Sequence, residues 1–244
     1  PRGVAMAAAV FALRTLLDDD VPTNDGIARA VVLDVPAGSA ANARWPAAVA
    51  AGNVEMSQRV ADTILAALGA AGVEVAAQGQ GTMNSVTFGG ARGAPTAGGD
   101  DAGAWTFYET LGGGQGASAR GAGPSAVHVG MSNTRNTPVE ALEQAYPLRV
   151  ETYALRDGSG GDGAHRGGDG VVRAYRALVP CAVTLLTERR ALAPRGAAGG
   201  ADGAPGVNRH GDAVLPAKCR VALAAGEVLT IETPGGGGWG TPSS

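Results

Sequence analysis

The sequence contains a single lysine, Lys218, and carries a formal net charge of only −3. Without a basic excess the chain cannot neutralise a run of phosphates, so generic nucleic-acid binding is disfavoured. The glycine-rich runs GGGQG (112–116) and GSGGDG (158–163) also lack the lysine and hydroxyl that complete a nucleotide-binding P-loop. We therefore expect both runs to form tight turns between strands.

Cysteine is almost as scarce as lysine. Cys181 and Cys219 are the only two, each lies in an apolar, strand-like run, and no CxxC pair occurs. We interpret both as buried free thiols in a reducing compartment, with a disulfide as the less favoured alternative. No run is long and apolar enough to cross a membrane, and we expect a cytoplasmic protein.

Several familiar catalytic signatures are absent. The sequence has no HExxH, no cysteine cluster and no histidine close to a carboxylate, so we expect no metal held by this chain. It also has no GxSxG elbow to present a nucleophilic serine. The residues alone therefore predict a polar pocket on a β scaffold rather than a complete catalytic machine.

The first third of the chain has helical patterning. Apolar residues recur with a period near 3.6 over residues 3–17 and 53–68, which predicts two helices, the second capped by Asn53. Between them, AVVLDV (30–35) predicts a strand. Because a helical pattern begins almost at Pro1, we interpret residues 1–74 as a helix-rich segment that continues from a missing N-terminal half.

Short apolar runs separated by glycine-rich turns follow from about residue 75. Residues 138–146 predict one short helix in this region, with Thr137 as its N-cap. The predicted fold class is α+β, with N-terminal helices packed on a mostly antiparallel, glycine-loop-rich β domain over residues 75–244. The predicted strands cover residues 85–88, 105–110, 126–131, 148–155, 171–179, 182–188, 220–224 and 227–233.

A polar, glycine-dense run over residues 108–170 is the strongest candidate for a binding surface, with hydrogen-bonding side chains at every position of 132–137. Arg135 offers a planar fork for a carboxylate or phosphate, and Asn133 and Asn136 offer amide groups. The alternative is an elaborate helix cap around Thr137, with Arg135 tied to Glu140 or Glu143.

Two titratable side chains are candidates for proton transfer. His128, in a predicted strand, is either a general base or a satisfied core residue. Glu55 is either a carboxylate near a substrate pocket or a residue that stabilises the positive end of its helix. We interpret His165 as a turn-bracing or solvent-facing histidine and His210 as an ordinary loop residue.

Two further polar or glycine-rich loops remain. The loop QGQGTMNS (78–85) offers Gln78, Thr82 and Asn84 as hydrogen-bonding candidates, with a satisfied turn as the alternative. The run PGGGGWG (234–240) predicts a flexible C-terminal segment with Trp239 as an aromatic anchor.

Six stretches carry a resemblance to a known family. They are AAVAAGNVEMSQRV, QGTMNSVTFGG, FYETLGGGQGA, HVGMSNTRNTPVEALEQAYPLRVETYALRDGSGG, GAHRGGDGVVR and TPGGGGWG. In order and over nearly the whole chain, they resemble the hydantoinase B/oxoprolinase family, which also includes the large subunit of acetone carboxylase.

The resemblance implies an ATP-dependent hydrolase of a cyclic amide such as a hydantoin or oxoproline. In such systems an A-type partner protein binds ATP and activates the amide oxygen, and the B-type component is thought to hydrolyse the ring. It further implies that this chain corresponds to the C-terminal half only, with a divalent metal on the N-terminal half. We therefore expect a hetero-oligomer in which this chain binds neither ATP nor metal.

Three hypotheses follow from the resemblance. In the first, residues 133–137 line the substrate site: Arg135 holds an anionic group, the asparagines orient the ring amide, and His128 or Glu55 relays protons. In the second, the chain is a non-catalytic assembly module that docks the A-type partner. In the third, it takes part in carboxylation, as in the acetone carboxylase branch.

Overall fold

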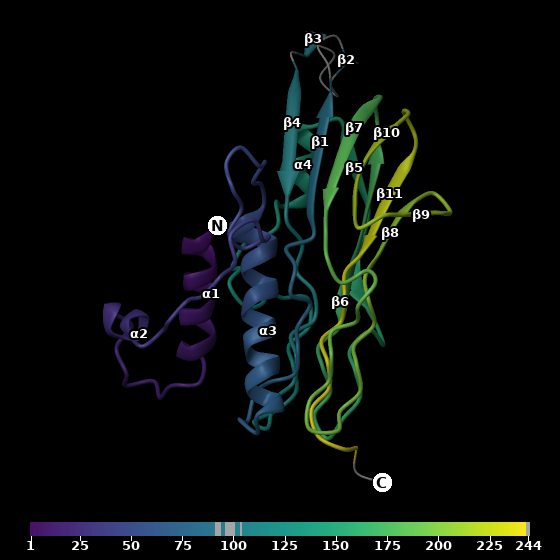
Figure 1. Ribbon diagram of the computed structural model, residues 1–244. Coiled ribbons are helices and arrows are strands. Elements are labelled where there is room, and N and C mark those ends of the chain that lie inside the picture. The colour runs from purple at the N-terminus through teal and green to yellow at the C-terminus, as the bar shows by residue number, and fades with distance from the viewer. Residues whose placement is uncertain (91–93, 96–100, 103, 243–244) are drawn as a thin grey trace. The chain divides into compact units, whose positions relative to one another are not determined.

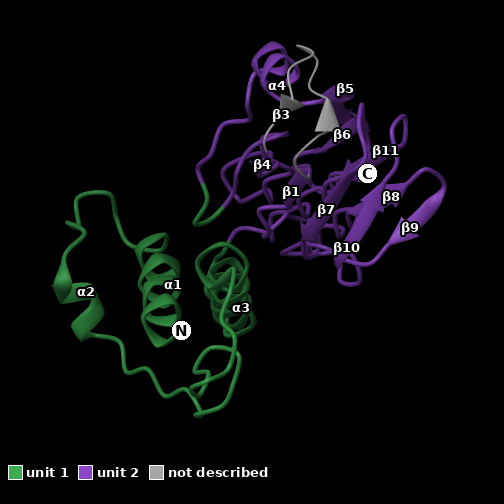
Figure 2. Cartoon of the chain, turned by 90° about the horizontal axis from the view of Figure 1, so that it is seen from above, with its two compact units in different colours: residues 1–75, 130–132 green, residues 76–129, 133–244 purple. Residues whose placement is uncertain are grey.

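The computed structural model describes residues 1–90, 94–95, 101–102 and 104–242. The chain divides into two compact units, coloured separately in Figure 2. Unit 1 comprises residues 1–75 and 130–132, and unit 2 comprises residues 76–129 and 133–244. None of the helices in the described residues has the length and hydrophobicity needed to span a bilayer.

Unit 1 is helical. Helices α1 (Arg2–Arg14) and α3 (Ser57–Ala70) pack together, the short helix α2 (Asp25–Arg29) lies between them in sequence, and a π-helical turn, η1 (Gly52–Met56), leads into α3. The buried face of α1 is made of alanines at the i, i+3, i+4 and i+7 spacing of one helical face. These residues are Ala5, Ala8, Ala9 and Ala12.

Two local predictions for unit 1 were wrong. Residues 30–35 belong to no strand, and Val32 is 95% exposed, because unit 1 supplies helices and no neighbouring strand to pair with. Asn53 lies inside η1 rather than at an N-cap, which is formed by Ala51 at a φ of 56°. Helix α2 went unpredicted, and its N-cap is Asn24, whose side chain accepts the N–H of Gly26.

Unit 2 is built on two antiparallel sheets, which confirms the α+β fold class (Figure 1). The four-stranded sheet has the order β10-β7-β1-β4 and the five-stranded sheet the order β5-β6-β11-β8-β9. The first sheet contains β1 (Ser85–Gly90), β4 (Trp105–Glu109), β7 (Cys181–Leu186) and β10 (Lys218–Leu223). The second contains β5 (Leu148–Arg156), β6 (Gly170–Ala177), β8 (Val207–His210), β9 (Ala213–Leu215) and β11 (Val228–Glu232).

The hydrophobic core of unit 2 combines apolar residues from both sheets. Phe88 of β1 and Tyr175 of β6 meet with ring centroids 5.1 Å apart, and Leu142 of helix α4 (Val139–Ala145) is fully buried in the same cluster. Burial alternates along β4, β7, β10 and β11, as the period of two requires. The sequence predicted most of the strands from short apolar runs between glycine-rich turns.

Some strand predictions for unit 2 were wrong. Residues 126–131 form no strand and contribute only an isolated bridge between Val127 and Gly113. The hairpin of β8 and β9 was missed, and His210 lies on β8 rather than in a loop. A short pair, β2 (Ala94–Pro95) with β3 (Asp101–Ala102), also went unpredicted.

The glycine-rich segments form a structure of their own, which we call the glycine bundle (lower part of Figure 1). It consists of extended segments that exchange backbone hydrogen bonds outside any sheet. The N–H groups of residues 235 and 238 donate to segment 194–204, those of 236 and 239 to segment 159–168, and that of 237 to segment 77–80. The segment that accepts the N–H bond therefore repeats every three residues along 235–239, which is the periodicity of a polyproline II helix. The remaining members are residues 112–117 and 123–127.

The glycine bundle corrects two predictions. The runs at 112–116 and 158–163 are not simple tight turns between strands, and the run at 234–240 is mostly buried rather than flexible. A Cβ on Gly236 would lie 2.0 Å from the carbonyl oxygen of Gln115, and one on Gly235 would lie 1.9 Å from that of Ser159. Glycine is therefore needed here for close backbone packing rather than for turning.

The side chain of Asp169 stabilises one edge of the glycine bundle through hydrogen bonds. Its carboxylate accepts two hydrogen bonds from Arg166, at 2.9 and 3.0 Å, and one from the N–H of Gly160 at 2.8 Å. The bonds from Arg166 are the main reason that the pKa of Asp169 is lowered from its ordinary value of 3.8. The carboxylate therefore favours the folded state above pH 3.8 and loses that effect as the pH falls through its lowered pKa.

We expect Asp169→Asn to lower the free energy of unfolding by about 1 kcal/mol at pH 7, a modest value because Arg166 is exposed to solvent. The difference from wild type should shrink as the pH falls below 3.8, where the wild-type carboxylate also becomes protonated. Urea unfolding at pH 7 and pH 3 measures both values. Asp162→Asn is the matched control, because Asp162 lies near the same arginine at 3.7 Å with an 82% exposed side chain. Equal losses in the two variants would contradict this role for Asp169.

Candidate functional site

The exposed part of the predicted binding run is residues 133–135. Asn133, Thr134 and Arg135 are all exposed to solvent. Within the described part of the chain, Arg135 has no ion pair, and the carboxylate of Glu143 instead accepts the N–H of Val150 at 2.8 Å. The predicted alternative, in which Arg135 is tied to Glu140 or Glu143 within a helix cap, is therefore wrong. The guanidinium is available to a ligand.

The next two residues are held in place by the fold. The amide nitrogen of Asn136 donates to the carbonyl of Thr110 at 2.9 Å, and its oxygen accepts the hydroxyl of Tyr153 at 3.0 Å. The backbone N–H of Thr137 donates to Glu109 at 2.9 Å. Thr137 is not the N-cap of α4, because Pro138 takes that position and makes no side-chain cap. A substrate-binding role for Asn136 and Thr137 stays a prediction, beside these structural bonds.

A buried charge cluster lies behind residues 136–137. Glu109 is 4% exposed and Arg173 and Tyr175 are fully buried. Arg173 Nη2 lies 3.2 Å from Glu109 Oε2, Arg173 Nε donates to the Tyr175 hydroxyl at 3.1 Å, and that hydroxyl donates to Glu109. The Arg173 guanidinium carbon also lies 4.2 Å from the centre of the Tyr153 ring. Burial, chiefly, raises the pKa of Tyr175 well above its ordinary value, so the phenol stays protonated.

Sequence reasoning missed this cluster, although a signal for it exists. Glu109 follows Phe107, and Tyr175 follows Arg173, at the spacing of two that places strand residues on the same face. A charged residue in the apolar phase of a strand points into the core, where it needs a partner. Here the partner comes from the other sheet, because Glu109 and Arg173 belong to different sheets whose apolar residues share one core.

His128 is half-buried, and both of its ring nitrogens are inaccessible to solvent and unpaired within the described residues. It does not lie on a strand, contrary to the prediction. Burial lowers its pKa below the ordinary 6.5, so the imidazole is neutral at pH 7. A neutral imidazole is the form that accepts a proton, and a general-base role stays a prediction.

Glu55 belongs to unit 1 and the other predicted site residues belong to unit 2. Its side chain is 5% exposed and lies on the π-helical turn η1, whose geometry results from the left-handed backbone of Ala51. π-helical turns are frequent at functional sites. The predicted proton-relay role of Glu55 stays a prediction.

The polar loop at residues 78–85 is a structural network. Arg190 donates to the side-chain oxygens of Asn84 and Asn208, both at 2.6 Å, and Arg189 donates to Gln78 at 2.8 Å. The hydroxyl of Thr82 accepts the backbone N–H groups of Asn84 and Glu188, each at 3.1 Å. The satisfied-turn interpretation is confirmed, because these side chains are engaged with the chain itself.

The remaining histidines and the cysteines form no second centre within the described residues. His210 lies 3.0 Å from a carboxylate oxygen of Glu227, and His165 bridges to Trp239 at an edge of the glycine bundle. Both cysteines are free: Cys181 is buried, as predicted, whereas Cys219 is only half-buried. Burial raises the pKa of Cys181 to about 11, so its reactive thiolate is scarce at neutral pH. Among the residues described, no three His, Cys, Asp or Glu side chains gather closely enough to hold a metal ion.

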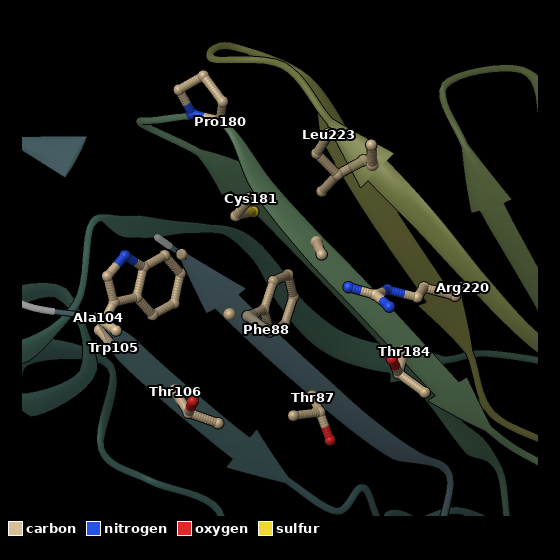
Figure 3. Close-up of a pocket in the computed structure, with 14 residues that line it drawn as sticks. Thr87, Phe88, Ala104, Trp105, Thr106, Pro180, Cys181, Thr184, Arg220 and Leu223 are labelled. Atoms are coloured by element: carbon tan, nitrogen blue, oxygen red, sulfur yellow. The ribbon is translucent and has the colours of Figure 1, made fainter. Parts of the chain in front are cut away.

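A shallow pocket of about 640 Å³ lies on the four-stranded sheet (Figure 3). Residues of β1, β4, β7 and β10 line it, and Trp105 and Arg220 lie on opposite sides of it. The pocket contains none of the predicted site residues. Residues 133–135 therefore remain the stronger candidate, since there an unpaired arginine is attached to a fixed support.

Comparison with known proteins adds independent information. The family model for hydantoinase B/oxoprolinase matches residues 1–242. The chain is 42% identical to 5-oxoprolinase 1 of Arabidopsis thaliana, across 99% of this chain and 18% of the plant protein. It is 30% identical to a putative B-type component of a D-/L-hydantoinase of Pseudomonas sp. (strain NS671), across 98% of this chain and 41% of that protein.

A solved structure shares the fold. The crystal structure of an ATP-dependent caprolactamase from Pseudomonas jessenii is similar with a TM-score of 0.80 and 25% identity, over 97% of this chain and 43% of the caprolactamase chain. The present chain therefore spans less than half of that enzyme and 18% of the plant relative.

Proposed function

Because this chain belongs to the hydantoinase B/oxoprolinase family, we propose that it is the C-terminal part of a B-type component in an ATP-dependent hydrolase of cyclic amides. One structural observation carries its role in that enzyme: Arg135 is exposed and unpaired, within the described residues, beside a segment that is tied to the β core. An arginine presented in this way suits recognition of a carboxylate or phosphate, because its planar fork matches two oxygens.

The proposed roles follow from the chemistry of the side chains. Arg135 holds an anionic group of the substrate or of its phosphorylated form, and Asn133 orients the ring amide. His128, neutral at pH 7, is the proposed acceptor of the proton of the attacking water, a role that requires the assembled enzyme to open its buried ring nitrogens to water. Glu55, a buried residue of unit 1, is the alternative acceptor. These groups bind, orient and take up a proton, while an A-type partner supplies ATP and phosphorylates the amide oxygen.

The metal implied by the family resemblance does not fit the described residues of this chain, which gather no set of three ligands. No step of the proposed mechanism therefore runs through a metal held here. The Pseudomonas relative is named as the B component of a hydantoinase, and this name supports an assembly of more than one chain.

Arg135→Ala tests the proposal in the assembled enzyme. We expect kcat/KM to fall by about 10- to 100-fold, because a charge-assisted bond to an anion contributes roughly 1.5–3 kcal/mol. Steady-state kinetics with ATP and the cyclic amide measures the effect. Arg120→Ala is the matched control, because Arg120 is likewise exposed and its side chain has no partner within the described residues. If the two variants behaved alike, the proposed role of Arg135 in holding an anionic group, its clamp role, would be abandoned.

A non-catalytic assembly role is the second candidate, favoured by exposed apolar side chains. Trp45 and Val32 of unit 1 are each 95% exposed, and Leu155 of unit 2 is 51% exposed. An exposed apolar side chain gains free energy when a partner covers it. Adding a polypeptide that corresponds to the N-terminal half of a relative separates the candidates: binding with activity supports a split enzyme, and binding without activity supports a scaffold.

A further inference from the structure

The segment that carries Arg135 is attached to the core at its C-terminal side by two separate anchors. We propose that the buried cluster of Glu109, Arg173 and Tyr175, acting with Tyr153, is a positioning device that fixes residues 133–135 for ligand binding. The inference deepens the proposed function and rests on it, since it concerns the geometry in which Arg135 is presented.

The first anchor is the carboxylate of Glu109. One of its oxygens accepts the backbone N–H of Thr137 at 2.9 Å, and the other accepts the hydroxyl of Tyr175. Arg173 lies within 3.4 Å of both oxygens. The carboxylate is thus held from the core side by a cation and a phenol, and its remaining bond is directed to the backbone two residues after Arg135.

The second anchor is the side chain of Asn136, adjacent to Arg135. Its oxygen accepts the hydroxyl of Tyr153, whose ring lies against the Arg173 guanidinium at 4.2 Å, and its nitrogen donates to the carbonyl of Thr110. Thr110 directly follows Glu109 at the end of β4. Both anchors therefore involve the end of β4, and both connect to Arg173, the first directly and the second through Tyr153.

The energetics favour positioning over simple stabilisation. Removing a cation and an anion from water costs about as much as their attraction returns, so a buried ion pair is a poor way to stabilise a fold. Arg173 also keeps Nη1 buried and without a partner in the described structure, which adds a further cost. The cluster instead fixes the positions of the groups that it binds, because charge-assisted bonds are short and geometrically specific.

A rotation of the Asn136–Thr137 peptide plane would break the bond to Glu109, and a displacement of the Asn136 side chain would break the bonds of the second anchor. Arg135, one residue earlier, is therefore confined to the positions that this peptide allows. Ordering a long arginine side chain at the moment of binding costs conformational entropy, and a support that is already fixed reduces that cost. The expected consequence of loosening an anchor is weaker binding with little change in the chemical step.

Tyr153→Phe is the informative variant, because it removes the hydroxyl bonded to Asn136 and keeps the ring that covers Arg173. Within residues 134–137, amide hydrogen exchange should become about tenfold faster at Thr137, whose N–H is bonded to Glu109, while exchange in β6 and β11 should stay unchanged. In the assembled enzyme, KM should rise by about tenfold with kcat within a factor of two, the pattern of lost binding without lost catalysis.

Tyr108→Phe is the matched control. Tyr108 is 53% exposed, against 50% for Tyr153, and its hydroxyl also makes one side-chain bond, to Ser85 at 3.1 Å. Unchanged exchange at residues 134–137 in Tyr153→Phe would overturn the proposal. So would faster exchange spread evenly over all strands, because that pattern reports a loss of global stability only.

Failure of the clamp role gives a different result. If Arg135→Ala left kcat/KM unchanged while Tyr153→Phe still loosened residues 134–137, the anchors would stand as a structural device and the proposed ligand contact would fall. If exchange stayed slow while Arg135→Ala abolished binding, the contact would stand and the anchors would lose their proposed part in it.

Discussion

Gly236→Ala should lower the free energy of unfolding by about 3 kcal/mol or more, which places it among the most damaging small changes available in this chain. The added Cβ would lie 2.0 Å from the carbonyl oxygen and 2.3 Å from the carbonyl carbon of Gln115. Both atoms belong to a backbone that is itself hydrogen-bonded within the glycine bundle, so neither can move aside cheaply. Urea unfolding followed by tryptophan fluorescence and circular dichroism measures the loss.

Gly89→Ala is the control for this prediction. Gly89 lies on β1, has no positive φ, and a Cβ there would meet only the carbonyl oxygen of Trp105 at 3.7 Å, an ordinary contact. We expect stability within about 1 kcal/mol of wild type, because an alanine without strain also restricts the unfolded chain. Similar losses at the two positions would show that the bundle does not depend on close backbone approach.

Glu109→Leu should destabilise unit 2 by about 3–5 kcal/mol, the usual result of leaving a buried charge without its partner. Arg173 is fully buried, and the Glu109 carboxylate is its ion-pair partner. The change also removes the acceptor for the Thr137 N–H. Chemical denaturation at pH 7 and low salt gives the free energy directly.

The double variant Glu109→Leu/Arg173→Met separates charge from shape. Because the unpaired cation is then gone, we expect it to recover most of the stability lost in Glu109→Leu, while exchange at residues 134–137 remains fast. Replacement of a buried ion pair by apolar residues is often neutral or stabilising. A double variant as unstable as Glu109→Leu would mean that the lost hydrogen bonds, and not the stranded charge, dominate.

The sheets could be predicted because their physical signal is local. Short apolar runs between glycine-rich turns mark β1, β4, β6 and β11, and the observed ladders pair β1 with β4 and β6 with β11 in antiparallel fashion. The wrong strand at residues 30–35 has the same local signal. It lacks a partner strand, and a strand is defined by pairing with residues that a local pattern does not contain.

The glycine bundle could not be predicted from side-chain patterns, because glycine has no side chain. Glycine is needed there because another backbone segment packs directly against it, as at Gly236, and that segment comes from a distant part of the sequence. Composition indicated only that glycine was abundant. Turns and flexible tails are the commoner use of such runs, and that expectation was wrong here.

The row of polar residues at 132–137 led to the candidate site, and its binding role stays a prediction. Residues 133–135 of that row are exposed. Glu109 and Arg173 were not found, because each reads as an isolated charge in its own strand. Their pairing depends on the register of two sheets and the packing between them, which single-strand patterns do not determine.

The order in which the ribosome delivers the chain has a consequence for the glycine bundle. Gly237 donates its N–H to the carbonyl of Gln78, and the same run bonds to segments 159–168 and 194–204. The earlier segments therefore lack these hydrogen-bond partners until residues 234–240 have been synthesised. Long-range closure of this kind folds slowly. Nascent chains stalled shortly before residue 234 should consequently remain open to proteases and chaperones, although nearly all of unit 2 has by then been made.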